Sequence, residues 1–569
     1  MKNTRILRLA TLLFALFVSN ALAPPSFAQA TFTWTTVVNN GVTVPGDTRN
    51  FNSYNQPSLS VNRLVVFRAR SKGGATGEPA HGIFTRDMAL ATPVVTIFDR
   101  NTTVPQPNNL GSTFVEPPSF PRIDMWSDTI ASRGNHQPVW NYLLPDGITE
   151  TRAGTTGIYT NPFGNLITGA SNLGAVPDFS FFAVPGTTPP VKFDVFPGAP
   201  AVTDDATIVF KGNYSAPDPA NPDATISKTG VYYRNLADEA IPVSEGAADL
   251  APAGGTNSVA VIADTDTLIP GTSTPFGSTA PPSAALREAV FAGFDNEENP
   301  TEGGIYLAPL TGQRPLLSAL VKIGDRVPGE KKGTVFNRLG EGVSFDGRFV
   351  AFWGAWGSEF TTLVLQCVNE GNKGRVVYCK QQYPNGFTTT VPVHQGIFVH
   401  DTVAHETFVV AKAPSDFTDF VYWNFSGLVP GTGESDDAGE PARWRSATFV
   451  AVSGLVNGSL KDPTFHAAFK ARTGHVVNGA YVNPVDGIYL RKGPSDSPIQ
   501  TVVKTGMDGT LIDPEAVDPL TAAVLPVTAM GLERDGFRGN SLAVNVSMGT
   551  EEAGWAGIYL TTVPAKKLR

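Results

Sequence analysis

Residues 342–352 have the sequence Gly-Val-Ser-Phe-Asp-Gly-Arg-Phe-Val-Ala-Phe, which is typical of a tight β-hairpin. Two short apolar segments, residues 343–345 and 349–353, flank the pair Asp346-Gly347. Because Asp and Gly adopt positive φ angles at little cost, this pair favours a short turn between two antiparallel strands. Degenerate copies of the hairpin recur along the 569 residues, so the fold can be predicted from them.

A second repeated pattern is a strand start of the form Gly-[Ile/Val]-[Phe/Tyr], which occurs at intervals of 70 to 92 residues. The copies begin at Gly82, Gly157, Gly230, Gly304, Gly396, Gly487 and Gly557. Each follows another apolar strand, such as residues 349–353 in the fifth unit and 448–453 in the sixth, and most have further strands on either side. Seven units of four antiparallel strands predict an all-β, seven-bladed β-propeller.

The two ends of the chain are predicted to complete each other. The seventh unit ends near Val563 without a fourth strand, and an unassigned strand, residues 32–38, stands near the start of the chain. We expect residues 31–46 to close the seventh blade and residues 31–569 to form one propeller domain. Closing the ring removes the sheet edge that would otherwise be exposed to other chains.

The hairpin at 344–352, followed by Gly396-Ile397-Phe398-Val399-His400-Asp401, resembles the repeat of bacterial TolB-type, WD40-like β-propellers. In that family an S-P-D-G turn leads into an apolar strand and then an I-Y-x-x-D strand. The resemblance is closest in the fifth unit, whereas the second unit has Asp124-Met125-Trp126-Ser127 at its turn. Since the family includes binding modules and propellers attached to peptidases, the resemblance implies a fold and no single activity.

Residues 1–30 are typical of a secretory signal, with three early cations, an apolar run at 9–18 and Ala28-Gln29-Ala30. The run is too short to span a bilayer, so we expect a secreted or periplasmic protein; an N-terminal membrane anchor is the alternative. The formal net charge of −9 argues against nucleic-acid and anionic-membrane partners. We expect a monomer without a membrane anchor.

Cys367 and Cys379 are the only two cysteines of the chain. In an exported protein, an isolated pair twelve positions apart predicts one disulfide that closes a small loop. A metal site built from two thiolates is the alternative.

The fifth and sixth units are longer than the others by about 17 residues, with insertions expected around 354–395 and 454–486, between the second and third strands. These loops emerge on the same face as the loops that enter the first strands, so we expect a ligand to bind there. The candidate binding and catalytic residues of this face are Arg68, Arg70, Arg133, His136, Asn213, Tyr214, Glu341, Trp353 and Trp356.

Arginine pairs with carboxylate or sulfate groups and aromatic rings stack on sugars, so the candidate face suits an acidic or sulfated glycan. The alternative is that the cations are solvated strand ends and that both Trp side chains belong to a blade core. Glu116, Glu341, Glu440 and Asp295 offer oxygen ligands for Ca²⁺, with solvated carboxylates as the alternative; no other cofactor is expected.

Two functions are consistent with the sequence. The first is a non-catalytic secreted propeller that binds an extracellular carbohydrate or protein. The second is a polysaccharide lyase or glycoside hydrolase acting on an acidic glycan, with His136 or Tyr214 as the base and Arg133 neutralising the uronate carboxylate. An enzyme requires His136, Tyr214 and Arg70 or Arg133 around one pocket, whereas a binder requires a shallow aromatic surface.

Overall fold

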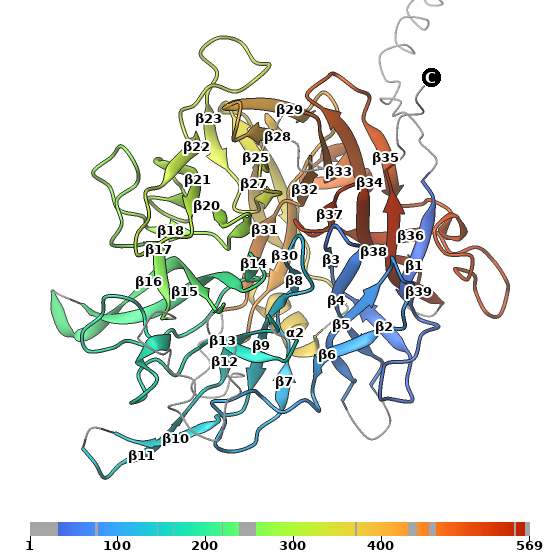
Figure 1. Ribbon diagram of the computed structural model, residues 1–569. Helices are drawn as coiled ribbons and strands as arrows, with labels where there is room; N and C mark the ends of the chain where they lie inside the picture. Colours follow the sequence, from blue (N-terminus) through green and yellow to red (C-terminus); the bar gives the residue numbers. More distant parts are fainter. Residues whose placement is uncertain are drawn as a thin grey trace, which may run out of the picture.

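The computed structural model describes residues 32–73, 78–144, 146–162, 164–218, 220–237, 258–369, 372–430, 441–454, 463–550 and 553–563. Seven antiparallel sheets in this part of the chain are arranged as a ring (Figure 1). The chain is therefore an all-β, seven-bladed propeller, and that prediction is confirmed. The predicted signal peptide, residues 1–30, lies outside the described residues. Within the described ranges, no helix is long and apolar enough to cross a membrane.

The first four blades follow one another in chain order, and each has its strands in order from the axis outward. Blade 1 contains β2(Phe51–Tyr54), β3(Ser58–Leu59), β4(Leu64–Ser71), β5(His81–Asp87) and β6(Val95–Asp99). Blade 2 contains β7(Phe114–Glu116), β8(Arg122–Ile123), β9(Ile130–His136), β12(Thr156–Thr160) and β13(Ile167–Ser171). Blade 3 contains β14(Ala201–Thr203), β15(Thr207–Asp218), β16(Asn221–Asn235) and β17(Ala260–Asp264). Blade 4 contains β18(Ser278–Thr279), β19(Ser283–Ala285), β20(Glu288–Phe294), β21(Gly303–Pro309) and β22(Ser318–Lys322).

The last three blades complete the ring. Blade 5 contains β23(Phe336–Leu339), β24(Ser344–Phe345), β25(Phe349–Trp356), β28(Gln395–Asp401) and β29(Glu406–Ala413). Blade 6 contains β32(Val450–Ser453), β33(Phe465–Val477), β34(Ala480–Gly493) and β35(Gln500–Lys504). Blade 7 contains β36(Val527–Gly531), β37(Phe537–Arg538), β38(Ser541–Gly549), β39(Gly554–Thr562) and β1(Trp34–Asn39).

Three small elements stand outside the blade sheets. They are the hairpin β10(Trp140–Leu143)–β11(Glu150–Ala153), the unit β26(Phe360–Leu365)–α2(Lys373–Gln382)–β27(Phe387–Pro392), and the hairpin β30(Tyr422–Ser426)–β31(Arg443–Ala447). Among the described residues α2 is the one α-helix; two short 3₁₀ turns are η1(Ser180–Phe182) and η3(Gly509–Leu511).

The N-terminal strand closes the ring, as predicted. β1 pairs antiparallel with β39, from Trp34 opposite Thr561 to Asn39 opposite Gly557. The buried carboxylate of Asp513 holds this closure, because its Oδ2 accepts hydrogen bonds from Asn39 Nδ2 at 2.8 Å and from Tyr559 Oη at 2.9 Å. The closing blade therefore has no free outer edge along β39.

The Gly-[Ile/Val]-[Phe/Tyr] motif has a packing cause. In each of the first six blades its aromatic ring packs against a phenylalanine near the axis, with centroids 4.6 to 5.4 Å apart. The motif ring also folds back over the motif glycine: a Cβ on Gly157 would lie 2.9 Å from Tyr159 Oη. In all seven blades a β-bulge with the fourth strand coincides with the last two motif positions. A larger residue at Gly157, Gly230, Gly487 or Gly557 would displace the ring, whereas at Gly82 and Gly304 it would collide with the fourth strand.

The sixth blade differs from the sequence-based assignment. Residues 448–453 are not its second strand, because β32 is the innermost strand and pairs with β33 at 465–477. The strands β33 and β34 are joined by only two residues, so the expected insertion at 454–486 is largely a long two-stranded ribbon. Most of the extra length of blade 6 lies instead in the β30–β31 hairpin, before its innermost strand. Fully buried Val450 and Val452 read equally well as an inner or a second strand, which explains the misassignment.

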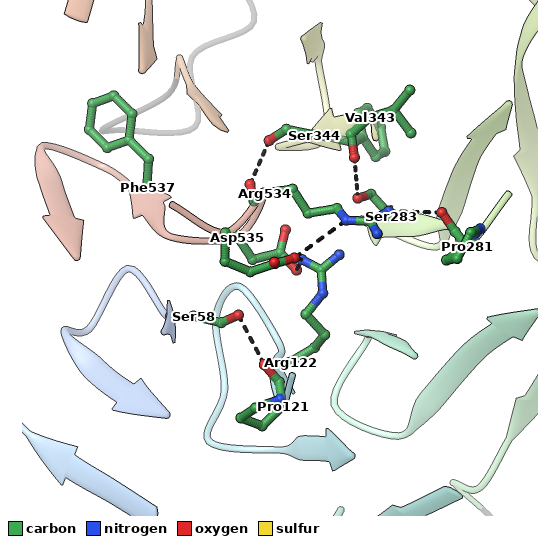
Figure 2. A network of polar contacts seen from close by, with 12 residues as sticks. Ser58, Pro121, Arg122, Pro281, Ser283, Val343, Ser344, Arg534, Asp535 and Phe537 are labelled. Carbon is green, nitrogen blue, oxygen red and sulfur yellow. Dashed lines mark hydrogen bonds and ion pairs between the residues drawn. The ribbon is translucent and has the colours of Figure 1, made fainter. Parts of the chain in front are cut away.

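The axis of the propeller is filled by a polar network centred on residues 533–538 of blade 7 (Figure 2). Buried Arg122 of blade 2 pairs with Asp535 at 2.5 Å, and Arg534 Nη1 donates to the carbonyl of Pro281 in blade 4 at 2.8 Å. The carbonyl of Arg534 accepts from Ser344 Oγ of blade 5 at 2.6 Å. One segment of the last blade thus holds several earlier blades across the axis.

Candidate functional site

We call the face on which each second strand leads into the third the upper face, and the opposite face the lower face. The upper face carries the unit β26–α2–β27 and the hairpin β30–β31, which lie over the middle of the ring in the view of Figure 1. We call these two elements the cap. The predicted disulfide is present in the cap, since Cys367 and Cys379 are bonded.

Aromatic side chains of the cap pack against each other. Phe387 of β27 stacks on Trp444 of β31 with centroids 6.2 Å apart, and Tyr383 lies edge-on to Phe425 of β30 at 6.1 Å. Arg443 of β31 reaches across to Glu297 of blade 4 at 2.5 Å. These rings therefore give the insertions a small core of their own.

The two tryptophans predicted to bind ligand are core residues of blade 5. Trp353 is buried and donates from Nε1 to Gln395 Oε1 at 2.9 Å. Trp356 is also buried and packs against the rings of His394 and Phe398. This corrects the expectation that they stack on a sugar, and the alternative of a blade core holds for both.

The proposed catalytic pair does not form one site. His136 lies in β9 of blade 2, packed edge-on against Phe114 and Tyr159, and burial lowers its pKa to about 4. Tyr214 lies in β15 of blade 3, and burial raises its pKa to about 12. Both side chains are buried and neither lines the two cavities described below, so the condition set for a lyase is not met.

The cationic candidates lie at repeated positions of the second strands. The residue opposite the second motif position is Arg68 in blade 1, Arg133 in blade 2, Lys211 in blade 3 and Lys470 in blade 6. Arg68 is already neutralised, because it pairs with Glu116 of blade 2 at 2.5 Å and donates to Asn55 at 2.9 Å. Lys470 lies over the ring of Tyr422 at 4.2 Å, and burial lowers its pKa to about 8.

The remaining upper-face candidates are spread out. Arg70 is exposed near the end of β4, Asn213 is half-buried in β15 with its backbone bonded to Val195, and Glu341 is exposed between β23 and β24. The structure brings together Arg68 and Glu116, and none of the other upper-face candidates lines the two cavities described below.

The carboxylates considered for Ca²⁺ do not converge. Glu116 is bound to Arg68, and Asp295 accepts from the backbone and hydroxyl of Thr301 at 2.9 and 2.7 Å. Glu440 lies outside the described residues. No group of three or more His, Cys, Asp or Glu side chains in the described ranges could hold a metal ion.

A cavity of about 570 Å³ lies on the lower face, between blades 1 and 2. We call it the Trp126 groove. It lies between the β3–β4 turn, the outer strands β5 and β6, and the β8–β9 turn. Its walls are formed by Ser60, Asn62, Leu64, Thr85, Asp87, Thr92, Val95, Ile97, Trp126, Ser127, Asp128, Ile130 and Asn161.

The β8–β9 turn holds Trp126 outward while fixing its backbone. The buried Asp124 accepts from the backbone N–H groups of Trp126 and Ser127, each at 2.8 Å. From blade 1, Asn62 Nδ2 donates to the carbonyl of Trp126 at 3.1 Å. The indole itself is 46% exposed, so the turn presents a large aromatic face on an anchored main chain.

The lining of the groove offers polar groups with spare hydrogen-bonding capacity. Thr85 is only 6% exposed, and its hydroxyl has no hydrogen bond to a described residue. Asn161 Oδ1 accepts from the backbone of Ile130 at 2.7 Å, which leaves its two Nδ2 hydrogens for a ligand. The carboxylates of Asp87 and Asp128 also line the groove, and Val95 and Ile97 are apolar residues of the lining.

A second cavity of about 390 Å³ lies between the loop at 180–190 and the residues Gln313 and Arg314. The guanidinium of Arg314 is occupied by Asp264, with contacts of 2.6 and 2.8 Å. The cavity begins beside residues 238–257, which lie outside the described part of the chain, so we assign no role to it.

Sequence reasoning noted the irregular turn at Asp124-Met125-Trp126-Ser127 but gave it no function. The available signal was a tryptophan in a turn whose other residues, apart from Met125, are short and polar. Thr85 and Asn161 could not be found in this way, because nothing in the sequence shows which turns of adjacent blades leave a space between them.

No protein-family model and no curated protein matches this chain. Among solved structures it is similar to the β-propeller domain of the Trilobed protease from Pyrococcus furiosus, with 9% identity, 92% of this chain and 97% of that chain covered, and a TM-score of 0.37. It is also similar to the α-L-arabinanase of Penicillium chrysogenum, with 11% identity, coverage of 82% and 97%, and a TM-score of 0.29. These likenesses concern the propeller fold, and the closer resemblance to TolB-type repeats stays a prediction.

Proposed function

We propose that this protein is an exported, non-catalytic propeller that binds carbohydrate in the Trp126 groove. The observation that carries the proposal is that Trp126, which is 46% exposed, lines a cavity of about 570 Å³ together with hydroxyl, amide and carboxylate groups. A pyranose ring has one face of C–H groups and a rim of hydroxyls, so it can stack on an indole while its hydroxyls bond to such groups. The volume lies in the ordinary range for small-ligand sites.

The proposal moves the ligand site from the upper face to the lower one. On the upper face, the two tryptophans are buried in the core of blade 5 and Arg68 is paired with Glu116, so these side chains are not available to a ligand. The groove has an exposed aromatic ring and polar groups that retain hydrogen-bonding capacity for a ligand. These features support a binding surface over a catalytic pocket.

Calorimetric titration of the full mature chain with a panel of soluble oligosaccharides tests the proposal. For an oligosaccharide that binds, Trp126→Ala should weaken binding by about tenfold or more, since stacking on an aromatic ring contributes on the order of 1 kcal/mol beyond area burial. Trp126→Phe should retain part of the affinity. Leu520→Ala, at a side chain that is 93% exposed outside the groove, is the matched control.

Retained binding in Trp126→Ala, or the absence of binding across the panel, contradicts the proposal. Measuring new reducing ends and unsaturated uronates in the same mixtures separates binding from cleavage. Release of either product would show that a carbohydrate-cleaving enzyme is the correct function.

A further inference from the structure

We infer that the Trp126 groove selects a cationic sugar, of the class of oligosaccharides of β-1,4-linked glucosamine with free amino groups. The inference rests on the proposed function and specifies its ligand. It differs from the acidic glycan that the cations of the upper face suggest.

The charge of the groove carries the first step. Its lining contains two carboxylates, Asp87 and Asp128, and no Lys, Arg or His. Asp87 Oδ1 accepts from the backbone of Ala89 and Leu90, which leaves Oδ2 for a ligand. Asp128 is exposed and forms no hydrogen bond to a described residue. An ammonium group can therefore pair with either carboxylate, whereas a uronate or sulfate would meet like charge.

The arrangement of the other groups carries the second step. The exposed indole of Trp126 can stack on the C–H face of a sugar and attract an ammonium group through its π-system. Thr85 lines the cavity although it is 6% exposed, and its hydroxyl is bonded to no described residue. Because Thr85 lines the cavity, its hydroxyl can bond to a hydroxyl or amine of a guest.

The charge of the whole chain acts in the same direction. The formal net charge is −9, which favours the approach of a polycation over that of a polyanion at low salt. A neutral glucan lacks the ammonium group, and an N-acetylated chain has replaced it by an amide. Both can stack on Trp126, so the inference concerns selectivity within one site.

Calorimetric titration at pH 5.5 with fully deacetylated glucosamine hexamer, its N-acetylated counterpart and cellohexaose tests the inference. We expect the deacetylated hexamer to bind about five- to tenfold more tightly than the other two, because each charge-assisted contact at a partly exposed site contributes up to about 1 kcal/mol. Asp128→Asn should remove part of this preference, because Asp87 remains, and should lower the affinity for cellohexaose less than the affinity for the deacetylated hexamer. Raising NaCl from 50 to 500 mM should weaken only the deacetylated ligand.

Asp178→Asn is the matched control, because Asp178 is exposed, lies outside the groove and has a positive φ of 71° that asparagine tolerates. Equal affinity for the three ligands, with binding lost in Trp126→Ala, overturns the charge selectivity and leaves the proposed function standing. Tighter binding of cellohexaose also overturns the selectivity. If none of the three binds and the wider panel fails as well, both the inference and the proposed function are wrong.

Discussion

The turns that join the innermost and second strands in blades 5 and 2 both begin with an aspartate but differ in length and in surroundings. In blade 5 three residues separate β24 from β25, and in blade 2 six residues separate β8 from β9. Each turn begins with an aspartate, Asp346 or Asp124, whose Oδ1 accepts from two backbone N–H groups of the turn. Both turns thus share the aspartate that accepts from the backbone, although they differ in length.

The surroundings of the two turns differ. Asp346 is 1% exposed, and its Oδ2 accepts from the backbone of Gly454 in blade 6 at 2.5 Å. In blade 2 the added residues carry Trp126 to the surface beside blade 1. The most regular copy of the repeat is used to pack neighbouring blades, and the most divergent copy forms the candidate site. The proposed function therefore depends on a departure from the repeat and not on its most regular copy.

The largest expected difference concerns the residue just before the second strand. Arg348 is buried and pairs with Asp401 at 2.9 and 2.6 Å, whereas Thr129 at that place in blade 2 donates to the carbonyl of Asp205. Arg348→Met leaves a buried carboxylate unpaired and should lower the free energy of unfolding by about 3–5 kcal/mol. Thr129→Val should cost about 1 kcal/mol. Urea denaturation of the two variants measures both.

The paired variant Arg348→Met/Asp401→Leu removes both charges and should recover part of that loss. A loss below about 1 kcal/mol for Arg348→Met alone would show that the ion pair does not stabilise blade 5.

The two aspartates give a matched second test. Asp346→Ala leaves three backbone N–H groups without their acceptor and should cost about 2–4 kcal/mol, with no effect on binding at the groove. Asp124→Ala removes an acceptor from two N–H groups and should cost about 1–2 kcal/mol. Because Asp124 anchors the backbone of Trp126, its loss should also weaken oligosaccharide binding several-fold. Equal effects of the two substitutions on binding would contradict the separate roles of the two turns.

The blade count could be predicted because its motif repeats along the chain. The closure by β1 and the disulfide could be predicted because each had one possible partner: one unassigned strand for one incomplete blade, and one pair of cysteines. Most motif glycines mark sites where an aromatic ring two residues later lies on the glycine, and this constraint operates within one strand. Blade 6 was misassigned because β32 has the same buried apolar pattern as a second strand.

The site could be predicted less well than the fold. Whether Trp353 is in a core or on a rim depends on Gln395, which is 42 residues away and accepts its indole hydrogen. Whether the guanidinium of Arg68 is available to a ligand depends likewise on Glu116 of the next blade, which pairs with it. The groove is a space between turns of two blades, and no single stretch of sequence encodes it.

Each of the two blades also holds a buried histidine, and these give a third test. Burial lowers the pKa of His136 in blade 2 and of His400 in blade 5 to about 4. In the unfolded chain histidine titrates near pH 6.5, so the stability that the neutral rings contribute is complete above about pH 6.5 and is lost as the pH falls toward 4.

Melting temperatures at pH 7.5 and 4.5 measure this loss. His136→Asn and His400→Asn should each reduce the acid-induced loss of stability by on the order of 2 kcal/mol. A pH dependence identical to that of the parent chain in both buried-site variants would contradict the neutral state of these rings.

The smallest expected effect isolates the contact between blade 1 and the divergent turn. Asn62 is exposed and donates from Nδ2 to the carbonyl of Trp126 at 3.1 Å. This hydrogen bond holds the backbone of the turn and does not involve the indole N–H. Asn62→Ala should weaken oligosaccharide binding about two- to threefold, corresponding to roughly 0.5 kcal/mol, and leave the melting temperature unchanged. Asn62→Asp keeps the size but removes the donor and should behave like Asn62→Ala toward neutral ligands. A tenfold loss of affinity in Asn62→Ala would contradict this role, because it would show that Asn62, which lines the groove, contacts the ligand directly.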